Sequence, residues 1–251
     1  HTKLLLISRE ENDEKLKHYA YIGTGNFNEK TAKIYADHGL LTSDETMTRD
    51  IRQVFYLLDR KLLLPKTSQV MISPFSTRKR FEKLIRREIK NSEAGKEAYI
   101  ILKMNSLEDE GMIEALVRAS QAGVKIQMIV RGICRLVPGV LGYTDNIEII
   151  SIVDRCLEHA RVYIFANAGQ EEMYIASADW MTRNLDRRVE VSVPIRDAAI
   201  YQEMRDLIDI QLNDDSKARL IHVDQDNRYV ANPKGKNRAQ LMTYEFLKEK
   251  L

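Results

Sequence analysis

Two short stretches of the chain each place a histidine two residues before a basic side chain. The chain begins His1-Thr2-Lys3, and a later stretch reads His159-Ala160-Arg161. Alternation along a β-strand sends residues i and i+2 to one face, so each imidazole would project beside its cation. Lysine and arginine neutralise phosphate oxygens, and a neutral imidazole is nucleophilic near pH 7. The two pairs therefore predict phosphate chemistry.

The surroundings of the two pairs also repeat. Each histidine is followed by a strand that leads into a turn of small residues, which reads Tyr21-Ile22-Gly23-Thr24-Gly25-Asn26 in the first case and Tyr174-Ile175-Ala176-Ser177-Ala178-Asp179 in the second. Laid without gaps from the two tyrosines, the segments pair Ile22 with Ile175, Thr24 with Ser177, Asn26 with Asp179 and Asp37 with Glu190. We interpret this pattern as an internal duplication.

A duplicated histidine suggests a division of labour in phosphoryl transfer. One imidazole would attack phosphorus while the other protonates the leaving oxygen. Lys3 and Arg161 would neutralise the non-bridging oxygens as charge redistributes in the transition state. A single histidine beside an apolar strand is more often structural than catalytic. The repetition of the pair, rather than either copy alone, favours the catalytic interpretation.

Length and composition bound the class of protein. A chain of 251 residues has room for two domains, and 44% hydrophobic with 30% charged residues is typical of a soluble globular protein. The net charge of +2 argues against a dedicated nucleic-acid binder, so anion binding must come from local clusters. Cys134 and Cys156 lack metal-ligand spacing, and no stretch resembles a signal peptide or membrane span. Because the first residue is not methionine, we expect a fragment of a longer protein.

The first part of the chain predicts strands followed by one helix. Strands are expected over 4–7, 19–22 and 35–41, with an exposed connection over 9–17. Thr42-Ser43-Asp44-Glu45 has capping-box spacing and opens a helix whose inward face would carry Ile51, Val54, Phe55 and Leu58. A linker is expected over 61–68, where Pro65 interrupts the pattern.

The rest of the chain alternates strands and helices. Strands are expected over 70–72, 98–104, 124–130, 147–152, 161–166, 173–177 and 189–195. Helices are expected from Thr77 to near Gly95, over 108–122 and 197–212, and from Asn237 after a polar loop over 232–236. Strand, helix and strand in succession indicate a parallel α/β unit with a right-handed crossover. The predicted fold class is therefore α/β.

Several side chains allow two interpretations. Arg131 follows the strand over 124–130, where open α/β sheets place ligands, but it could also pair with Asp154. Tyr35 reads from its pattern as a half-buried strand residue, and Trp180 as a packing anchor. Two basic runs are either solvated surface or anion-binding sites. For Arg183, Arg187 and Arg188 the two interpretations have equal weight. For the run Arg78, Lys79, Arg80, Arg86 and Arg87 the interpretation as helix surface is favoured.

The histidine motifs resemble those of the phospholipase D superfamily. That family has His-x-Lys, an Asp after four intervening residues, and a Gly-Ser/Thr-x-Asn turn downstream. Here Ser8 and Ala166 stand at the Asp positions, and Arg161 replaces the second lysine. Generic phosphodiesterases of the superfamily therefore fit poorly.

Longer motifs along essentially the whole chain resemble the two carboxyl-terminal domains of the polyphosphate kinase family. They are His1-Thr2-Lys3, the segment 21–28, Val130-Arg131-Gly132, the segments 151–155 and 157–159, Ser177-Ala178-Asp179-Trp180-Met181-Thr182-Arg183-Asn184, and Asn227-Arg228-Tyr229-Val230. The long motif around Trp180 is the most specific of them.

The resemblance implies reversible transfer of the terminal phosphate of ATP to inorganic polyphosphate through a phosphohistidine, with magnesium. His1 falls on the phosphorylated histidine, and His159 on a second histidine that contacts the nucleotide and assists proton transfer. Tyr35 falls on a tyrosine that contacts ATP, and Arg131 on an arginine that contacts nucleotide phosphate. The family's magnesium arginines and two further domains would lie upstream of His1, so we assign no metal ligand within the chain.

The resemblance also implies two phospholipase-D-like α/β halves related by pseudo-two-fold symmetry. Residues 1–68 would be the C-terminal part of the first half plus the linker, truncated on its N-terminal side, and residues 69–251 the second half with a helical tail. We expect a cytoplasmic homo-oligomer that can associate peripherally with the inner membrane and that binds ATP, ADP and polyphosphate but not nucleic acid.

Two other functions are open at this point. A phospholipase-D-like phosphodiesterase or nuclease could use the same histidines, and it would turn over nucleic acid or lipid without ATP. A non-catalytic module could bind polyanions through the same cations. In that case, replacing His1 or His159 with alanine would leave binding intact.

Overall fold

The computed structural model describes residues 1–251 except 12–15, 62, 232–234 and 251. In the first part of the chain the elements are β1 (Lys3–Glu10), β2 (Leu16–Gly23), α1 (Glu29–Ala32), β3 (Tyr35–Ala36), β4 (Gly39–Thr42) and α2 (Glu45–Leu58). They are followed by β5 (Met71–Ser73), α3 (Thr77–Glu93), β6 (Tyr99–Met104), α4 (Glu110–Gln121), β7 (Lys125–Val130), β8 (Ile147–Ile152), β9 (Leu157–Glu158) and β10 (Arg161–Phe165). The chain ends with η1 (Asn167–Gly169), β11 (Glu172–Ala176), α5 (Thr182–Asp186), β12 (Glu190–Pro194), α6 (Ala198–Leu212), β13 (Ala218–Ile221) and α7 (Ala239–Lys248).

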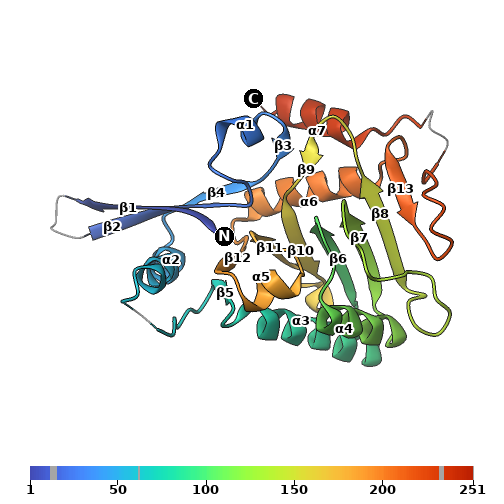
Figure 1. The fold of residues 1–251 in the computed structure, drawn as a ribbon, viewed down its shortest axis with the longest axis horizontal. Helices are drawn as coiled ribbons and strands as arrows, with labels where there is room; N and C mark the ends of the chain where they lie inside the picture. The colour runs from blue at the N-terminus through green and yellow to red at the C-terminus, as the bar shows by residue number, and fades with distance from the viewer. Residues whose placement is uncertain (12–15, 62, 232–234, 251) are drawn as a thin grey trace.

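An eight-stranded mixed sheet forms the centre of the molecule, with strand order β13-β8-β7-β6-β10-β11-β12-β5. Alternation along β10 divides the core between its two faces. Tyr163 and Phe165 pack with α3 and α4, whereas Val162 and Ile164 pack in the cluster that includes α2 and α6. Figure 1 shows α3 and α4 together on one side of this sheet and α6 on the other. The predicted α/β fold class is confirmed.

The predicted parallel α/β unit is also confirmed. β6 and β7 pair in parallel from Tyr99–Lys125 to Met104–Val130, and α4 connects them. The α4 N-terminus is capped by the Asp109 side chain, which accepts a hydrogen bond from the backbone N–H of Met112 at 3.0 Å. Arg131 therefore stands at the carboxyl end of β7, beside the carboxyl end of β6.

The predicted duplication is visible in the strand registers. In a three-stranded sheet of order β1-β2-β4, Lys3 pairs with Gly23 and Gly23 with Gly39. In the large sheet, Arg161 pairs with Ala176 and Ala176 with Ser192. The gapless alignment matches Gly23 to Ala176 and Gly39 to Ser192, so both antiparallel hairpins have the same register. The two His-x-cation strands therefore occupy equivalent places.

The segment expected as one strand over 35–41 is split into two short strands. β3 pairs in parallel with β9 of the second half, and β4 pairs with β2. Asp37 lies at the break, where its side chain bonds to Thr24 and His159 instead of continuing a ladder. Tertiary contacts of one carboxylate therefore override the local strand pattern.

Helix α2 differs in part from its expected burial. Asp44 is the N-cap and accepts from the Met47 backbone N–H at 2.7 Å, and Ile51 and Val54 are fully buried. Leu58 is 51% exposed, because it is the last residue of the helix and lies beyond the face that packs against the sheet. The expected linker runs between α2 and β5, and its residue 62 lies outside the described residues, as do parts of the segments 9–17 and 232–236.

The last helix docks back near the histidine of the second half. The Gln240 side chain donates to the Cys156 carbonyl at 2.7 Å and to the Glu158 carboxylate at 2.8 Å. Arg238 forms a two-point ion pair with Asp154 at 2.8 and 2.6 Å. These contacts hold β9, which directly precedes His159. Among the described residues, no helix is both long enough and apolar enough to span a bilayer.

Candidate active site

His1 and Lys3 lie at the start of β1. Lys3 Nζ is 3.0 Å from His1 Nδ1, and the Lys3 residue is only 6% exposed. Burial lowers the pKa of the Lys3 ammonium, the Glu190 carboxylate opposes this effect, and the Arg161 guanidinium adds to it. The cation of the first half thus lies within electrostatic reach of the cation of the second.

His159 is held by a carboxylate from the other half of the duplication. Its Nδ1 lies 2.8 Å from Asp37 Oδ1, which also accepts a 2.6 Å hydrogen bond from the Thr24 hydroxyl. The Tyr35 ring lies against the imidazole, with 4.9 Å between ring centroids. Burial tends to raise the pKa of the Asp37 carboxyl, but its hydrogen bonds from His159 and Thr24 hold the pKa below its usual value. An ionised Asp37 therefore fixes the ring of His159.

Arg161 connects His159, the first half and a buried carboxylate. Its Nη1 is 3.2 Å from His159 Nε2 and donates to the Thr24 carbonyl at 3.3 Å. Its Nε and Nη2 donate to the two oxygens of Asp179 at 3.2 and 3.0 Å. Burial tends to raise the pKa of Asp179, but the positive charge of Arg161 and backbone N–H groups of Asn105 and Ser106 keep it low. The pair is thus a charged one with several supporting hydrogen bonds.

Glu190 is the counterpart of Asp37 in the second half. Ser177 donates to Glu190 at 2.5 Å, just as Thr24 donates to Asp37 in the first half. Glu190 is fully buried, and Asn184 donates to its other oxygen at 3.1 Å. Its charge acts on Lys3. The alignment of the two copies already paired these four residues, but it did not indicate that Asp37 contacts the opposite half.

Arg131 does not pair with Asp154, the acidic partner that the sequence offered as an alternative to a ligand. Its Nε donates to the Glu158 carbonyl at 2.9 Å, and its Nη2 donates to the Asn105 side chain at 2.8 Å. Asp154, the alternative partner, is bonded to Arg238 instead. The backbone carbonyl of Glu158 immediately precedes His159, so Arg131 is held beside the second histidine.

Contacts between the described residues join the predicted site residues into two groups. His1 touches Lys3, and Arg161 and His159 touch each other and the Thr24–Asp37 pair of the first half. Tyr35 and Arg131 flank His159 on different elements. The group at His159 thus brings one imidazole, two cations and one aromatic ring to the junction of the two halves, and the His1–Lys3 pair forms the other group. Such a site can bind phosphate groups and move a proton through His159.

The described residues do not supply a ready magnesium site. No group of three or more His, Cys, Asp or Glu side chains among them is arranged to hold a metal ion. The carboxylates of the site, Asp37, Asp179 and Glu190, are each bonded to protein donors. This arrangement does not fit magnesium held by these residues alone, so the side-chain chemistry proposed below uses the chain's own groups.

Replacing Asp37 with asparagine is expected to lower the turnover number of a reaction in which His159 transfers a proton by about 10²-fold, with little change in KM. The amide leaves the ring of His159 without a negative partner. Steady-state kinetics across a pH series would check this, with the exposed Asp59→Asn as control. Unchanged turnover, or a change in KM alone, would contradict a positioning role.

The pKa of Asp37 is lower in the folded protein than its ordinary value of 3.8. The ionised carboxylate therefore contributes its full stabilisation above pH 3.8, and this stabilisation is lost as the pH falls through the lowered pKa.

Comparisons with known proteins agree over nearly the full chain. Residues 1–63 match the sequence model of Polyphosphate kinase C-terminal domain 1, and residues 70–240 match that of Polyphosphate kinase C-terminal domain 2. Polyphosphate kinases from Vibrio parahaemolyticus and Escherichia coli K12 are 49% and 47% identical over 251 residues. These alignments cover 99% of this chain but 36% of each relative. The chain thus spans little more than a third of the length of the curated relatives that it matches.

Solved structures show the same relationship. The crystal structure of polyphosphate kinase from Porphyromonas gingivalis superposes with a TM-score of 0.93 at 41% identity, covering 99% of this chain and 39% of that one. Phosphatidylserine synthase from Haemophilus influenzae superposes with a TM-score of 0.54 at 10% identity, covering 92% of this chain and 67% of that one. The second likeness shows a shared fold alone.

Proposed function

This chain belongs to the polyphosphate kinase family, and from that premise we propose that its protein transfers a phosphoryl group reversibly between ATP and inorganic polyphosphate. The observation that best supports this is the junction itself, where the His–cation pair of the second half contacts Thr24 and Asp37 of the half that carries His1 and Lys3. Arg161 contacts His159 and a carbonyl of the first half, and its charge acts on Lys3.

In the proposed first step, a ring nitrogen of His1 attacks the γ-phosphorus of ATP. The N–P bond forms as the bond from phosphorus to the bridging β,γ-oxygen breaks, and ADP leaves with the bonding electron pair. Lys3 and Arg161 offset the charge on the non-bridging oxygens. Because an ammonium only donates, the Lys3 contact leaves the proton of a neutral His1 on Nε2, so attack through Nε2 requires Lys3 to turn from Nδ1 toward the phosphate oxygens and the ring proton to move to Nδ1.

In the second step, a terminal oxygen of polyphosphate attacks the phosphorus held on His1. The N–P bond breaks, its electron pair returns to His1, and the polymer is one unit longer. His159 supplies a proton to the leaving ADP oxygen in the first step and recovers one before the next cycle. Tyr35 and Arg131 flank His159, where we propose that the nucleotide and its phosphates bind.

The direct test uses the full-length protein with ATP, magnesium and a polyphosphate primer. We expect ATP consumption to match polymer elongation, and ADP with polyphosphate to yield ATP in reverse. Hydrolysis of nucleic acid or phospholipid without ATP would instead support the phosphodiesterase alternative. Polyphosphate binding without any transfer would support a non-catalytic module. Homo-oligomer formation and peripheral membrane association are further expectations for the whole protein.

A further inference from the structure

A second concentration of positive charge lies away from the histidines, between α3 and the start of β11. It lines a cavity of about 560 Å³ with six cations and a single carboxylate, an excess larger than the +2 of the whole chain. The cations are Arg80, Lys83, Arg86, Arg87, Lys90 and Arg196. Such a local excess in a concave site concentrates anions.

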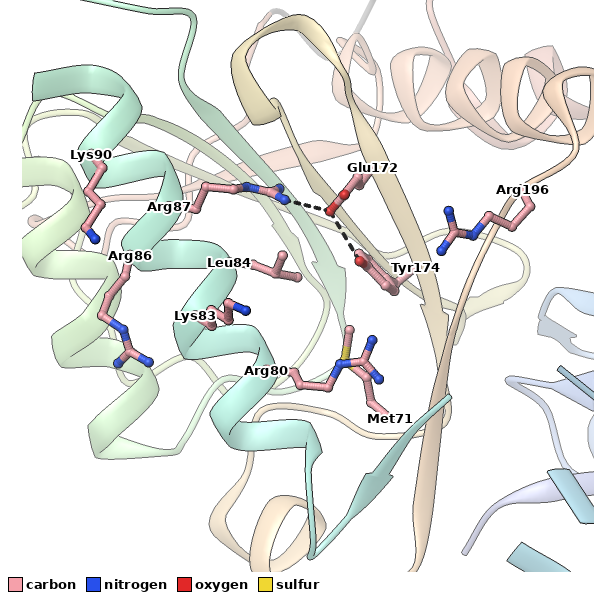
Figure 2. A pocket seen from close by; sticks show the side chains of 10 residues that line it. All are labelled: Met71, Arg80, Lys83, Leu84, Arg86, Arg87, Lys90, Glu172, Tyr174 and Arg196. Atoms are coloured by element: carbon pink, nitrogen blue, oxygen red, sulfur yellow. Dashed lines mark hydrogen bonds and ion pairs between the residues drawn. The ribbon is translucent and has the colours of Figure 1, made fainter. Parts of the chain in front are cut away.

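The cations reach the cavity from two sides. Figure 2 shows Arg80 and Arg87 extending from α3 toward the sheet, while Arg196, which follows β12, approaches from the opposite side. Lys83, Lys90 and Arg196 are exposed, and no ion pair is formed by any of the three within the described residues. We call these three side chains, with Arg80 and Arg87, the α3 groove.

One guanidinium of the α3 groove has a buried donor without a partner. Arg87 donates to Glu172 at 3.0 Å and to Glu88 at 3.2 Å, but its Nη2 is buried and has no hydrogen-bond acceptor among the described residues. A buried N–H without an acceptor is unfavourable, and because solvent does not reach this atom, an oxyanion in the groove would bond to it only after the Arg87 side chain shifts. The net charge of the groove alone does not reveal this unpaired donor.

The chemistry of the groove favours a polyanion without bases. Tyr174 is its aromatic side chain, but it is only 7% exposed and bonds to Glu172, so it cannot offer a face for stacking. The apolar lining residues are Met71, which is buried, and Leu84, which is packed against the core. A membrane-binding face would instead expose apolar side chains around its cations.

The groove also lies within reach of the transfer site. β11 runs from Glu172 at the groove to Ala176, and the chain continues to Asp179 beside Arg161, a path of roughly 20 Å. Helix α5, which contains the exposed Arg183 and is followed by the exposed Arg187, contacts both α3 and β5. Figure 1 places α5 between α3 and the N-terminus that carries His1. Cations are thus available along the way.

We propose that the α3 groove is a second binding site for inorganic polyphosphate, which holds a distal part of a long chain whose end is at His1. This inference rests on the proposed function for the identity of the polyanion. Short chains that reach only one of the two sites would bind at the transfer site without using the groove. The groove would therefore favour long polymers and keep them associated between successive transfers.

The test compares full-length protein with two triple variants of equal charge change. The groove variant carries Lys83→Glu, Lys90→Glu and Arg196→Glu, and the control carries Arg118→Glu, Lys125→Glu and Lys248→Glu, three cations that do not line the groove. We expect the groove variant alone to bind long-chain polyphosphate about tenfold more weakly near 0.1 M salt, with a salt slope shallower by about 2 to 3. Circular dichroism would confirm that both variants fold.

Three further measurements separate the outcomes. Tripolyphosphate binding and phosphorylation by ATP should be unchanged in the groove variant, and His1→Ala should keep groove-dependent binding. Equal effects of the two triple variants would overturn the proposal, as would a loss confined to phosphatidylserine vesicles. If wild-type protein transfers no phosphate yet the groove variant still loses polyphosphate binding, the proposed function fails while the second site stands.

Discussion

Replacing His1 with alanine is expected to lower phosphoryl transfer from ATP to polyphosphate by at least about 10³-fold. The substitution removes the nitrogen proposed to carry the phosphoryl group. The neighbouring Lys3 provides no equivalent nucleophile, because an ammonium group has no free electron pair. The rate of polymer elongation by the full-length protein would measure the loss.

The matched control is His222→Ala, which removes an imidazole that bonds to Asp224 far from the junction. It should retain the wild-type rate. Equal rates for His1→Ala and wild type would show that no phosphohistidine at this position lies on the reaction path. Similar losses in both variants would point to a general effect on folding.

Replacing Asp179 with alanine is expected to lower the free energy of unfolding by about 3 to 5 kcal/mol. The change leaves the guanidinium of Arg161 buried without its carboxylate, and it removes the acceptor of the Asn105 backbone N–H at 2.8 Å. The lowered pKa of Asp179 makes this contribution complete at neutral pH and lost as acid protonates the carboxylate. Denaturant unfolding of this 251-residue chain and its Asp179→Ala variant at pH 7 would measure the change in the free energy of unfolding.

Asp186→Ala provides the comparison, because Asp186 is 42% exposed and pairs with Arg78, which keeps a second partner in Asp109. Its loss should cost less than about 1 kcal/mol. If the two variants unfolded at the same denaturant concentration, the buried Arg161–Asp179 pair would not be a main contributor to stability.

Local patterns in the sequence predicted most strands, the parallel crossover and the duplication, because these depend on periodicity and on short-range turns. The equivalence of Thr24 with Ser177 and of Asp37 with Glu190 is confirmed by matching hydroxyl–carboxylate hydrogen bonds. The alignment could pair these residues, since each lies at a fixed distance from its own tyrosine.

The partner of His159 could not be predicted in the same way. Asp37 is 122 residues away in the chain and belongs to the other copy, so no local spacing connects the two. The superfamily motif has an Asp separated from His-x-Lys by four residues, and Ala166 stands at that position in the second copy. An acidic partner was therefore missing from the local pattern, and only the fold shows that it comes from the first half.

The α3 groove illustrates the same limit. Arg80, Arg86 and Arg87 read from the sequence as a solvated helix face, because helical spacing explains their positions. Pairing of β12 with β11 brings Arg196 to the same cavity from a segment more than a hundred residues away. Five of the six cations lie on α3 itself, and the order of strands in the sheet adds the sixth from the opposite side.

The central claim is that His1 carries the transferred phosphate. The full-length protein would be incubated with γ-labelled ATP without polyphosphate, digested, and its labelled peptide identified. We expect acid-labile, alkali-stable label on the peptide that contains His1, and we expect added polyphosphate to discharge it. Label on another peptide, or transfer without any labelled protein, would contradict the account.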